Sequence, residues 1–346
     1  MVSHAHLAMV LFFLTTTTLT LVLSTLLLHF MWPAKRKWDP RGQHCYVTGG
    51  SSGLGLAVAI ALTRRGAHVS IIARNEERLM NALGEMEKVR TNANQKLQTF
   101  SFSLTNAESS SMALEAASQA HDGVPPHAVF LCAGASTPGF FVEEDAKSLQ
   151  RGMENTYWVQ AYSALAYTKQ IVHRKTPGKL IFVSSLLGYM SIIGYSSYAP
   201  GKHALRGLAE TLRSELLLYD CSVHIMFPGN INSPGLIEEN RFKPKITLEL
   251  ESTSKPESPQ VLAESLINGV QRGEFHITAD ILGDIFRSST IGATPHNNVI
   301  LDGVYATIGW IGLPLWRRDV DSTVLKHRSE HSDYLAARGF YSSSSL

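Results

Sequence analysis

Short apolar runs alternate with longer amphipathic stretches from residue 43 to about residue 285 of this 346-residue chain. The runs are rich in Val, Ile and Phe and apolar on both faces, which is typical of strands buried in a parallel sheet. They are HCYVT (44–48), HVSIIA (68–73), LQTFSFSL (97–104), HAVFLCA (127–133), KLIFVSS (179–185) and CSVHIMFPG (221–229). Because helical periodicity follows these runs, the pattern predicts an α/β fold with a doubly wound parallel sheet. In such a sheet the ligand site lies at the carboxyl ends of the strands.

The alternation stops between residues 228 and 259, where the chain is polar, rich in proline and without a clear period. A long irregular segment at the carboxyl ends of the strands predicts a lid, which we place at 229–258. A second apolar run, 299–316, carries Asp302 and ends in Arg317 and Arg318. We expect it to lie in a membrane interface or to dip into a membrane, since Asp302 makes a full crossing doubtful. An ordinary amphipathic surface helix is the alternative.

The amino-terminal segment has no charged side chain before Lys35, and residues 7–32 are almost entirely apolar or Thr. A helix of this length rises about 1.5 Å per residue and crosses a hydrocarbon layer of about 30 Å. The threonine hydroxyls can bond to carbonyls one turn back. A cleaved signal peptide is the rival interpretation, but the basic cluster 35–37 follows the apolar run instead of preceding it. Trp32 and Trp38 bracket that cluster, which indicates an interfacial position.

These features predict an uncleaved membrane anchor with the remaining chain in the cytosol. We expect four parts: an anchor (1–34), a basic linker (35–42), a catalytic domain (43–285), and a membrane-associated segment with a polar tail (286–346). The formal net charge of +2 and the absence of a basic face give no indication of nucleic-acid binding. Cys45, Cys132 and Cys221 are far apart in apolar runs, so we interpret them as reduced core residues and expect no metal site.

The first predicted strand ends in TGGSSGLG (48–55), and a predicted helix begins there. Gly49, Gly53 and Gly55 permit a tight turn and a close backbone approach to a pyrophosphate. The amino end of the helix then supplies N–H groups and partial positive charge. A glycine loop at this place, after the first strand of an alternating series, predicts a dinucleotide site.

The end of the second strand indicates which dinucleotide is bound. A site for the unphosphorylated cofactor usually has an acidic residue there, but this chain has Ala73 followed by Arg74, with Arg78 one turn later. A carboxylate would repel a 2′-phosphate, whereas a guanidinium binds it. The sequence therefore predicts NADPH.

The chain resembles the short-chain dehydrogenase/reductases, a family with a Rossmann-type doubly wound sheet. The resemblance rests on TGGSSGLG, LCAG (131–134), Asn155 in MENTYW, Ser185 in FVSSLLG, and Tyr198 with Lys202 in YAPGK. Ser185 precedes Tyr198 by thirteen residues, as in the family. The resemblance implies that Ser185 orients a ketone oxygen, that Tyr198 protonates it, and that Asn155 holds a water that links Lys202 to solvent.

The spacing of Tyr198 and Lys202 has a physical reason, since residues four apart share one face of a helix. A nearby ammonium favours the phenolate, so we expect Lys202, together with the positive charge of the oxidised nicotinamide, to lower the pKa of Tyr198 toward the working range. By the resemblance, Lys202 also holds the nicotinamide ribose. Pro200 and Gly201 are tolerable because they fall in the first turn of the helix. Tyr195 competes as the proton donor, but its partner four residues on is Ala199.

The resemblance also implies further cofactor contacts, and the chain departs from the family at two places near them. The family usually has Asn where this chain has Leu131 and Asp where it has Ser103, so we expect weaker adenine recognition. The remaining expected contacts are Ser51, Ser52, Leu54, Leu104, Ala133, Gly134, Pro228, Gly229 and Ile231.

The lid sequence PGLIEENRFKPKIT (234–247) resembles that of the 3-ketodihydrosphingosine reductases of the endoplasmic reticulum. The resemblance implies NADPH-dependent reduction of a long-chain 3-keto sphingoid base in sphingolipid synthesis, at that membrane. Either Glu238 or Glu239 is a candidate partner for the ammonium of such a substrate. The alternative is that both carboxylates are solvated or pair with Arg241 or Lys243. The rivals are a membrane reductase of a steroid, retinal or 3-ketoacyl thioester, and a non-catalytic scaffold. Many relatives pair through the helices that carry Asn155 and Tyr198, so a homodimer or tetramer is possible.

Overall fold

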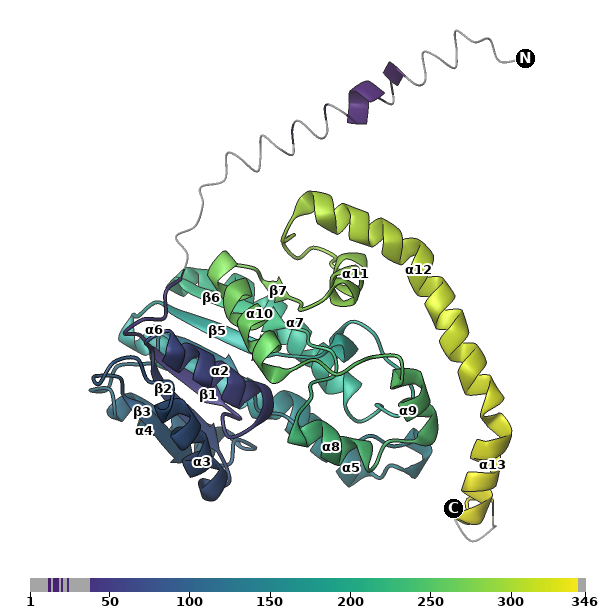
Figure 1. Ribbon diagram of the computed structural model, residues 1–346, viewed down its shortest axis with the longest axis horizontal. Coiled ribbons are helices and arrows are strands. Elements are labelled where there is room, and N and C mark those ends of the chain that lie inside the picture. The colour runs from purple at the N-terminus through teal and green to yellow at the C-terminus, as the bar shows by residue number, and fades with distance from the viewer. Residues whose placement is uncertain (1–11, 14, 19, 21–23, 25–37, 342–346) are drawn as a thin grey trace.

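The computed structural model describes residues 12–13, 15–18, 20, 24 and 38–341 (Figure 1). Most of the predicted anchor and all of the basic cluster 35–37 lie outside the described residues. The described threonines of the anchor bond as expected, since the Thr16 hydroxyl donates to the Phe12 carbonyl at 2.7 Å. The Thr20 hydroxyl donates in the same way to the Thr16 carbonyl at 2.7 Å.

The core of the molecule is a seven-stranded parallel sheet in the order β3-β2-β1-β4-β5-β6-β7. The strands are β1 (His44–Thr48), β2 (His68–Ala73), β3 (Leu97–Ser101), β4 (Ala128–Leu131), β5 (Gly178–Val183), β6 (Cys221–Met226) and β7 (His276–Ile277). The six predicted strands and the doubly wound order are confirmed. β7 was not predicted, because two residues are too few to give a periodic pattern.

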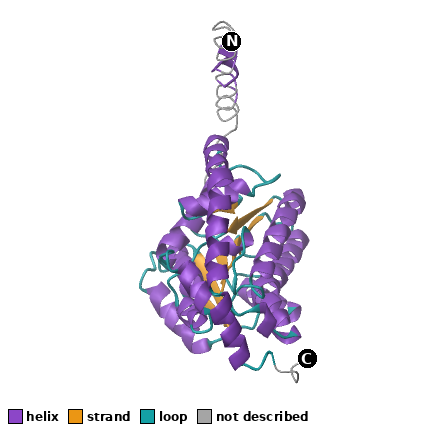
Figure 2. Ribbon diagram, turned by 90° about the vertical axis from the view of Figure 1, so that its right-hand side faces the viewer, coloured by secondary structure: helices purple, strands orange, loops and turns teal. Residues whose placement is uncertain are grey.

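Helices cover both faces of the sheet (Figures 1 and 2). One face packs against α2 (Gly53–Arg64), α3 (Glu76–Glu87) and α10 (Pro259–Arg272). The other packs against α4 (Ala107–Gln119), α6 (Val159–Arg174) and α7 (Ala199–Glu215). Each face of the sheet buries its own apolar cluster. Because β4 pairs with both β1 and β5, the carboxyl ends of these three strands lie side by side.

The segment predicted to be an irregular lid contains two short helices, α8 (Pro234–Asn240) and α9 (Lys245–Glu251). Each has only seven residues, so the hydrophobic pattern is too short to reveal a helical period. Pro234 occupies the first turn of α8, and Pro244 directly precedes α9, both of which are favourable positions for proline.

Three helices follow the last strand: α11 (Ile281–Ser289), α12 (Val299–Lys326) and α13 (Arg328–Ala337). α12 runs along one side of the molecule and leads to α13 (Figure 1). The predicted apolar run 299–316 forms the first part of α12.

Trp38 packs against the folded domain, and its position at a membrane interface stays a prediction. Its ring lies 6.2 Å from the ring of Phe130, and its indole N–H donates to the Gln43 side chain at 2.7 Å. The ring thus packs against the apolar cluster that contains Phe130, because Trp38 lies shortly before the start of β1.

Candidate active site

The loops after β1, β4 and β5 meet at one edge of the sheet. Gly49 has φ +67° and Gly53 has φ +55°, in the left-handed region that favours glycine. A Cβ on Gly49 would lie 3.0 Å from the backbone of Ala133, and one on Gly55 would lie 2.3 Å from the Gly49 carbonyl. The glycine loop therefore folds tightly on itself and against the turn after β4, as predicted.

The amino end of α2 opens from this loop and has no side-chain cap. Ser52 is the capping residue, and its side chain makes no capping hydrogen bond. The first N–H groups of α2 thus have no side-chain partner, and the region carries the positive end of the helix dipole. This donor set fits a pyrophosphate.

The arginines predicted to bind a 2′-phosphate lie at the end of β2. Arg74 and Arg78 are both exposed, and Asn75 caps α3 by accepting from the Arg78 N–H at 2.8 Å. The β2 end is adjacent to the glycine loop, because the Gly49 N–H donates to the Ile72 carbonyl at 2.8 Å.

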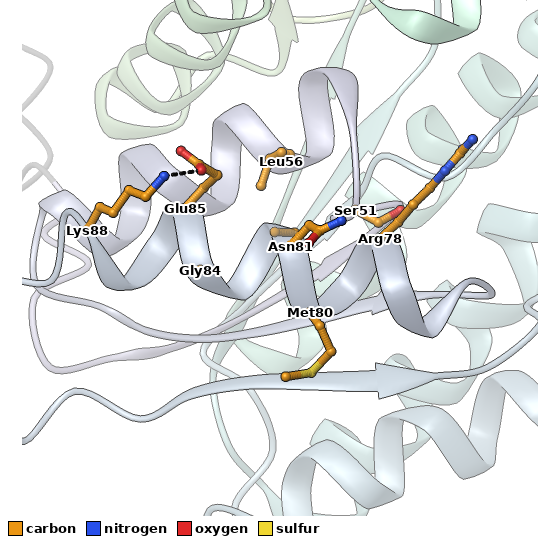
Figure 3. A pocket seen from close by; sticks show the side chains of 9 residues that line it. Ser51, Leu56, Arg78, Met80, Asn81, Gly84, Glu85 and Lys88 are labelled. Carbon is orange, nitrogen blue, oxygen red and sulfur yellow. Dashed lines mark hydrogen bonds and ion pairs between the residues drawn. The ribbon is translucent and has the colours of Figure 1, made fainter.

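A groove of about 420 Å³ runs between α2 and α3 beside these residues (Figure 3). Ser51 and Arg78 line one end of it, and the ion pair of Glu85 with Lys88 lies at the other. The groove therefore borders the glycine loop at the end that holds Ser51 and Arg78.

The expected adenine contacts lie after β3. The Ser103 hydroxyl lies 3.1 Å from the Thr105 hydroxyl, and Leu104 is buried in the core. On the other side of the site, the Pro228 carbonyl accepts from the Leu186 N–H at 2.9 Å, which ties the loop after β6 to the one after β5. Gly229 and Ile231 follow this tie and are half-buried.

Tyr198 and Lys202 lie at the start of α7, as predicted. Tyr198 is the N-cap residue, and its carbonyl accepts from the Lys202 N–H at 3.3 Å. The Lys202 ammonium lies 5.4 Å from the centre of the Tyr198 ring and donates to the Val183 carbonyl at 3.1 Å. Ser185 lies two residues after β5, close enough to the Tyr198 hydroxyl to lower the pKa of Tyr198. The structure therefore brings Ser185, Tyr198 and Lys202 together.

Asn155 lies in a π-helical turn (Glu154–Trp158) between α5 (Ala146–Met153) and α6. Such turns often occur at functional sites. The Asn155 carbonyl accepts from the Ala135 N–H at 3.1 Å. A Cβ on Gly134 would lie 3.3 Å from this carbonyl oxygen and 3.7 Å from the Lys202 ammonium, so the three groups share a small volume beside the glycine loop.

This arrangement agrees with the comparisons with known proteins. Residues 43–243 match the family model described as short chain dehydrogenase. The chain belongs to the short-chain dehydrogenase family.

Within this family, the chain is most usefully compared with individual relatives. The chain is 40% identical over 332 residues, 94% of its length and 99% of the relative's, to "3-ketodihydrosphingosine reductase TSC10" of Cryptococcus neoformans var. neoformans serotype D. It is 32% identical over 259 residues, 75% of its length and 77% of the relative's, to "3-dehydrosphinganine reductase" of Danio rerio. A Burkholderia phymatum short-chain dehydrogenase solved with NAD aligns with a TM-score of 0.63 at 17% identity, covering 71% of this chain and 91% of that one. This last likeness shows the fold.

Burial dominates the electrostatics of Tyr198 in this short-chain dehydrogenase. Its pKa lies above the ordinary value, because burial penalises the phenolate and the Glu239 carboxylate adds repulsion. The nearby Ser185 side chain acts in the opposite direction. The lowering expected from Lys202 together with the oxidised nicotinamide stays a prediction, since it depends on the bound nicotinamide as well. Tyr198 is consequently protonated at neutral pH, as a proton donor must be.

Lys202 is itself affected by the protein interior. It is 4% exposed, and burial lowers its pKa to about 8. The Val183 carbonyl is its hydrogen-bond acceptor. The ammonium form therefore persists at neutral pH with a small margin.

Two positioning residues were missed by the sequence reasoning. The Thr48 hydroxyl accepts from the Ala133 N–H at 3.1 Å and joins the ends of β1 and β4. Gln160 is fully buried and clamps Val183, donating to its carbonyl at 2.8 Å and accepting from its N–H at 3.2 Å. Thr48 is the first residue of TGGSSGLG, which was a usable sequence signal, whereas no sequence signal pointed to Gln160.

Leu131 stands where the family usually has Asn, and its side chain is buried in the core.

The lid carries a buried polar network that faces Tyr195. The Tyr195 hydroxyl lies 2.7 Å from Glu239 and 2.6 Å from Glu251. The Lys243 ammonium, whose side chain is fully buried, lies 3.0 Å from Glu239 and 2.6 Å from Glu251. Burial and these two carboxylates raise the pKa of Tyr195. Tyr195 is therefore a lid contact and stays protonated.

Proposed function

We propose that this protein reduces the 3-keto group of 3-ketodihydrosphingosine to dihydrosphingosine, a step in sphingolipid synthesis, with NADPH as the hydride donor. The observation that carries the proposal is the similarity to a relative named 3-ketodihydrosphingosine reductase. This chain is 40% identical to that relative over 99% of the relative's length. The cluster of Ser185, Tyr198 and Lys202 at the edge of the sheet supplies the chemistry of ketone reduction. The intact cluster speaks against a non-catalytic scaffold.

The residues of this chain would deliver a proton to the ketone oxygen and later replace it. When bound, the reduced nicotinamide supplies the hydride that adds to the carbonyl carbon. The hydroxyls of Ser185 and Tyr198 hydrogen-bond to the ketone oxygen and orient it, and Tyr198 transfers its proton to that oxygen. The Lys202 ammonium beside the ring stabilises the phenolate that remains. The Asn155 carbonyl, close to Lys202, is placed to hold a water for reprotonation.

NADPH is favoured over NADH by charge at the end of β2. Arg74 follows the strand, Arg78 lies in the first turn of α3, and no acidic residue occupies the strand end. The test compares kcat/KM for NADPH and NADH in the wild type and in the Arg74→Ala and Arg78→Ala double variant. We expect the variant to lose about 10- to 100-fold toward NADPH, since each tenfold is about 1.4 kcal/mol, and little toward NADH. Equal losses for both cofactors would contradict 2′-phosphate binding.

The substrate proposal is tested with a panel of carbonyl compounds. Purified protein in lipid vesicles would be given 3-ketodihydrosphingosine, a 3-ketosteroid, retinal or a 3-ketoacyl thioester, each with NADPH. We expect the first to be turned over with the highest kcat/KM. A higher value for any other compound would identify a different reductase.

The rate should depend on the protonation state of Lys202. Because burial lowers the pKa of Lys202 to about 8, the ammonium is lost as the pH rises through that value. We expect kcat/KM to fall about tenfold per pH unit above about pH 8. In Lys202→Arg the guanidinium stays charged, so this alkaline decrease should be absent even if the rate is lower throughout. The wild-type profile staying flat to about pH 10 would refute the role of the ammonium.

Glu239 is the better of the two candidate partners for the substrate ammonium. Both carboxylates have a cationic partner, since Glu238 pairs with Arg241 at 2.6 Å and Glu239 with Lys243 at 3.0 Å. Glu238 is exposed, whereas Glu239 faces inward and raises the pKa of Tyr198. We expect Glu239→Gln to raise KM about tenfold, because an ion pair at a partly buried site contributes on the order of 1–2 kcal/mol. Glu238→Gln is the matched control and should leave KM unchanged. Equal KM values for the two variants would remove Glu239 from substrate binding.

We also propose that the protein is anchored in the endoplasmic reticulum membrane with its catalytic domain in the cytosol. The uncharged segment 7–32, followed by the basic cluster 35–37, supports this orientation. Protease added outside intact microsomes should digest the catalytic domain. If the catalytic domain were digested only after the membrane was permeabilised, the domain would lie in the lumen and the proposed orientation would be wrong.

A further inference from the structure

α12 combines a membrane-like composition with firm attachment to the catalytic domain. Among the described residues it is the one helix that is long and apolar enough to cross a membrane, and its most apolar 18-residue window is 11% buried. Five of its exposed apolar side chains recur at intervals of four, four, three and four residues, which places these five on one helical face. We call this face the α12 stripe; it consists of Ile300, Val304, Ile308, Ile311 and Leu315.

The opposite face of α12 begins with a buried ion pair. Asp302 is 1% exposed and accepts from Arg287 of α11 at 2.7 Å. Its second oxygen lies 3.0 Å from His296 and accepts from the Asn297 N–H at 3.1 Å. The charge that made a full crossing doubtful is therefore turned toward the protein and paired there.

The attachment continues along the helix. Gly309 lies so close to α11 that a Cβ would be 2.0 Å from the Ser289 hydroxyl. The Trp316 ring packs at 5.5 Å on Phe286. Arg317 donates to the Ser191 carbonyl at 2.9 Å, in the loop between Ser185 and Tyr198.

The far end of α12 is tied to the same domain. His327, which ends α12, lies 3.0 Å from Glu249 of lid helix α9. In α13, Glu330 pairs with Lys245 at 2.7 Å, and Tyr334 donates to Glu143 at 2.7 Å. A helix of 28 residues is about 42 Å long, so a spanning helix would place its two ends on opposite sides of a bilayer. Both ends of α12 are instead held by one folded domain.

We propose that α12 lies in the plane of the membrane surface, with the α12 stripe inserted among the lipid chains, and does not cross the bilayer. A bilayer is the occupant that the surroundings of the stripe favour. No charged side chain lies on the stripe, and Arg317 and Arg318 follow it where anionic headgroups would be. Trp310, outside the stripe on the same helix, is 79% exposed, and exposed tryptophan is enriched at membrane interfaces.

This position has a consequence for the substrate, which rests on the proposed function. α12 contacts lid helix α9 and the loop before Tyr198, so the lid lies beside the membrane surface. A long-chain substrate would enter from the bilayer without passing through water.

The first test asks on which side of a bilayer the two ends of α12 lie. Single cysteines replace Ala293, before α12, and Lys326, at its end, in the full chain reconstituted in sealed phosphatidylcholine–phosphatidylserine vesicles. Vesicles with the catalytic domain outside are treated with a membrane-impermeant maleimide. We expect both cysteines to react before lysis, and the wild type, with Cys45 and Cys221 buried and Cys132 half-buried, to give the background. Reaction of only one end before lysis would show a spanning helix and overturn the proposal.

The second test asks what covers the stripe. An environment-sensitive fluorophore on Ile308→Cys should brighten in vesicles and be shielded from an aqueous quencher. The same label on Leu218→Cys, an exposed apolar position of the turn Leu216–Tyr219, should remain accessible. Full quenching at residue 308, or a disulfide between two copies through Ile308→Cys in the absence of lipid, would contradict the bilayer as occupant. Both tests are independent of turnover, so they stand apart from the assays of the proposed function.

Discussion

Tyr198→Phe should lower kcat by about 10³-fold, within the range of 10²–10⁴ that general acid catalysis contributes. The hydroxyl lies near Ser185 and is protonated at neutral pH, because burial and Glu239 raise its pKa. Phenylalanine keeps the ring that lies beside Lys202 but has no proton to give. The rate of NADPH oxidation with 3-ketodihydrosphingosine measures the effect.

The binding of the cofactor separates a chemical defect from a folding defect. We expect the dissociation constant for NADPH, measured by fluorescence titration, to change by less than about threefold in Tyr198→Phe. Tyr195→Phe is the matched control, since Tyr195 contacts the lid carboxylates and has no lysine one turn later. It should change KM more than kcat. A Tyr198→Phe enzyme with more than about a tenth of the wild-type kcat would exclude Tyr198 as the acid.

Gly201→Ala should destabilise the protein, although alanine is the better helix former. A Cβ at residue 201 would lie 1.8 Å from the Thr156 hydroxyl and 2.7 Å from its Cβ. Alanine gains about 1 kcal/mol in helix propensity, but overpacking of this kind costs about 1–3 kcal/mol, and the contact here is severe. We expect a net loss of about 2 kcal/mol, seen as a decrease of about 5 °C in Tm.

A second glycine of the same helix provides the control. Gly207 is exposed and has nothing within 4 Å of an added Cβ, so Gly207→Ala should raise stability by up to about 1 kcal/mol. Thr156→Ala in the Gly201→Ala background should recover part of the loss, because the clashing hydroxyl is gone. Equal Tm values for Gly201→Ala and Gly207→Ala would show that α7 does not depend on this contact.

The same glycine shows what the sequence can and cannot predict. Helix geometry explained why Pro200 and Gly201 are tolerated in a first turn, and that position is confirmed. Helix geometry could not show that Thr156, 45 positions earlier, leaves no room for a side chain at residue 201. That contact depends on how the π-helical turn packs against α7.

The sheet was predictable because each strand is a local apolar run, and the dinucleotide loop because its glycines are contiguous. The spacing of Tyr198 and Lys202 shows that they share a helical face. It could not show that burial and Glu239, 41 positions later, raise the pKa of Tyr198. The network of Tyr195 with Glu239 and Glu251 joins residues 44 and 56 positions apart and left no local pattern.

The central claim is that this cluster passes a proton to a ketone of a sphingoid base while NADPH supplies the hydride. The most direct measurement follows NADPH and dihydrosphingosine together in vesicles that contain the purified full chain and 3-ketodihydrosphingosine. We predict one dihydrosphingosine formed for each NADPH oxidised, and much slower formation with NADH. NADPH consumption without dihydrosphingosine, or no consumption at all, would contradict it.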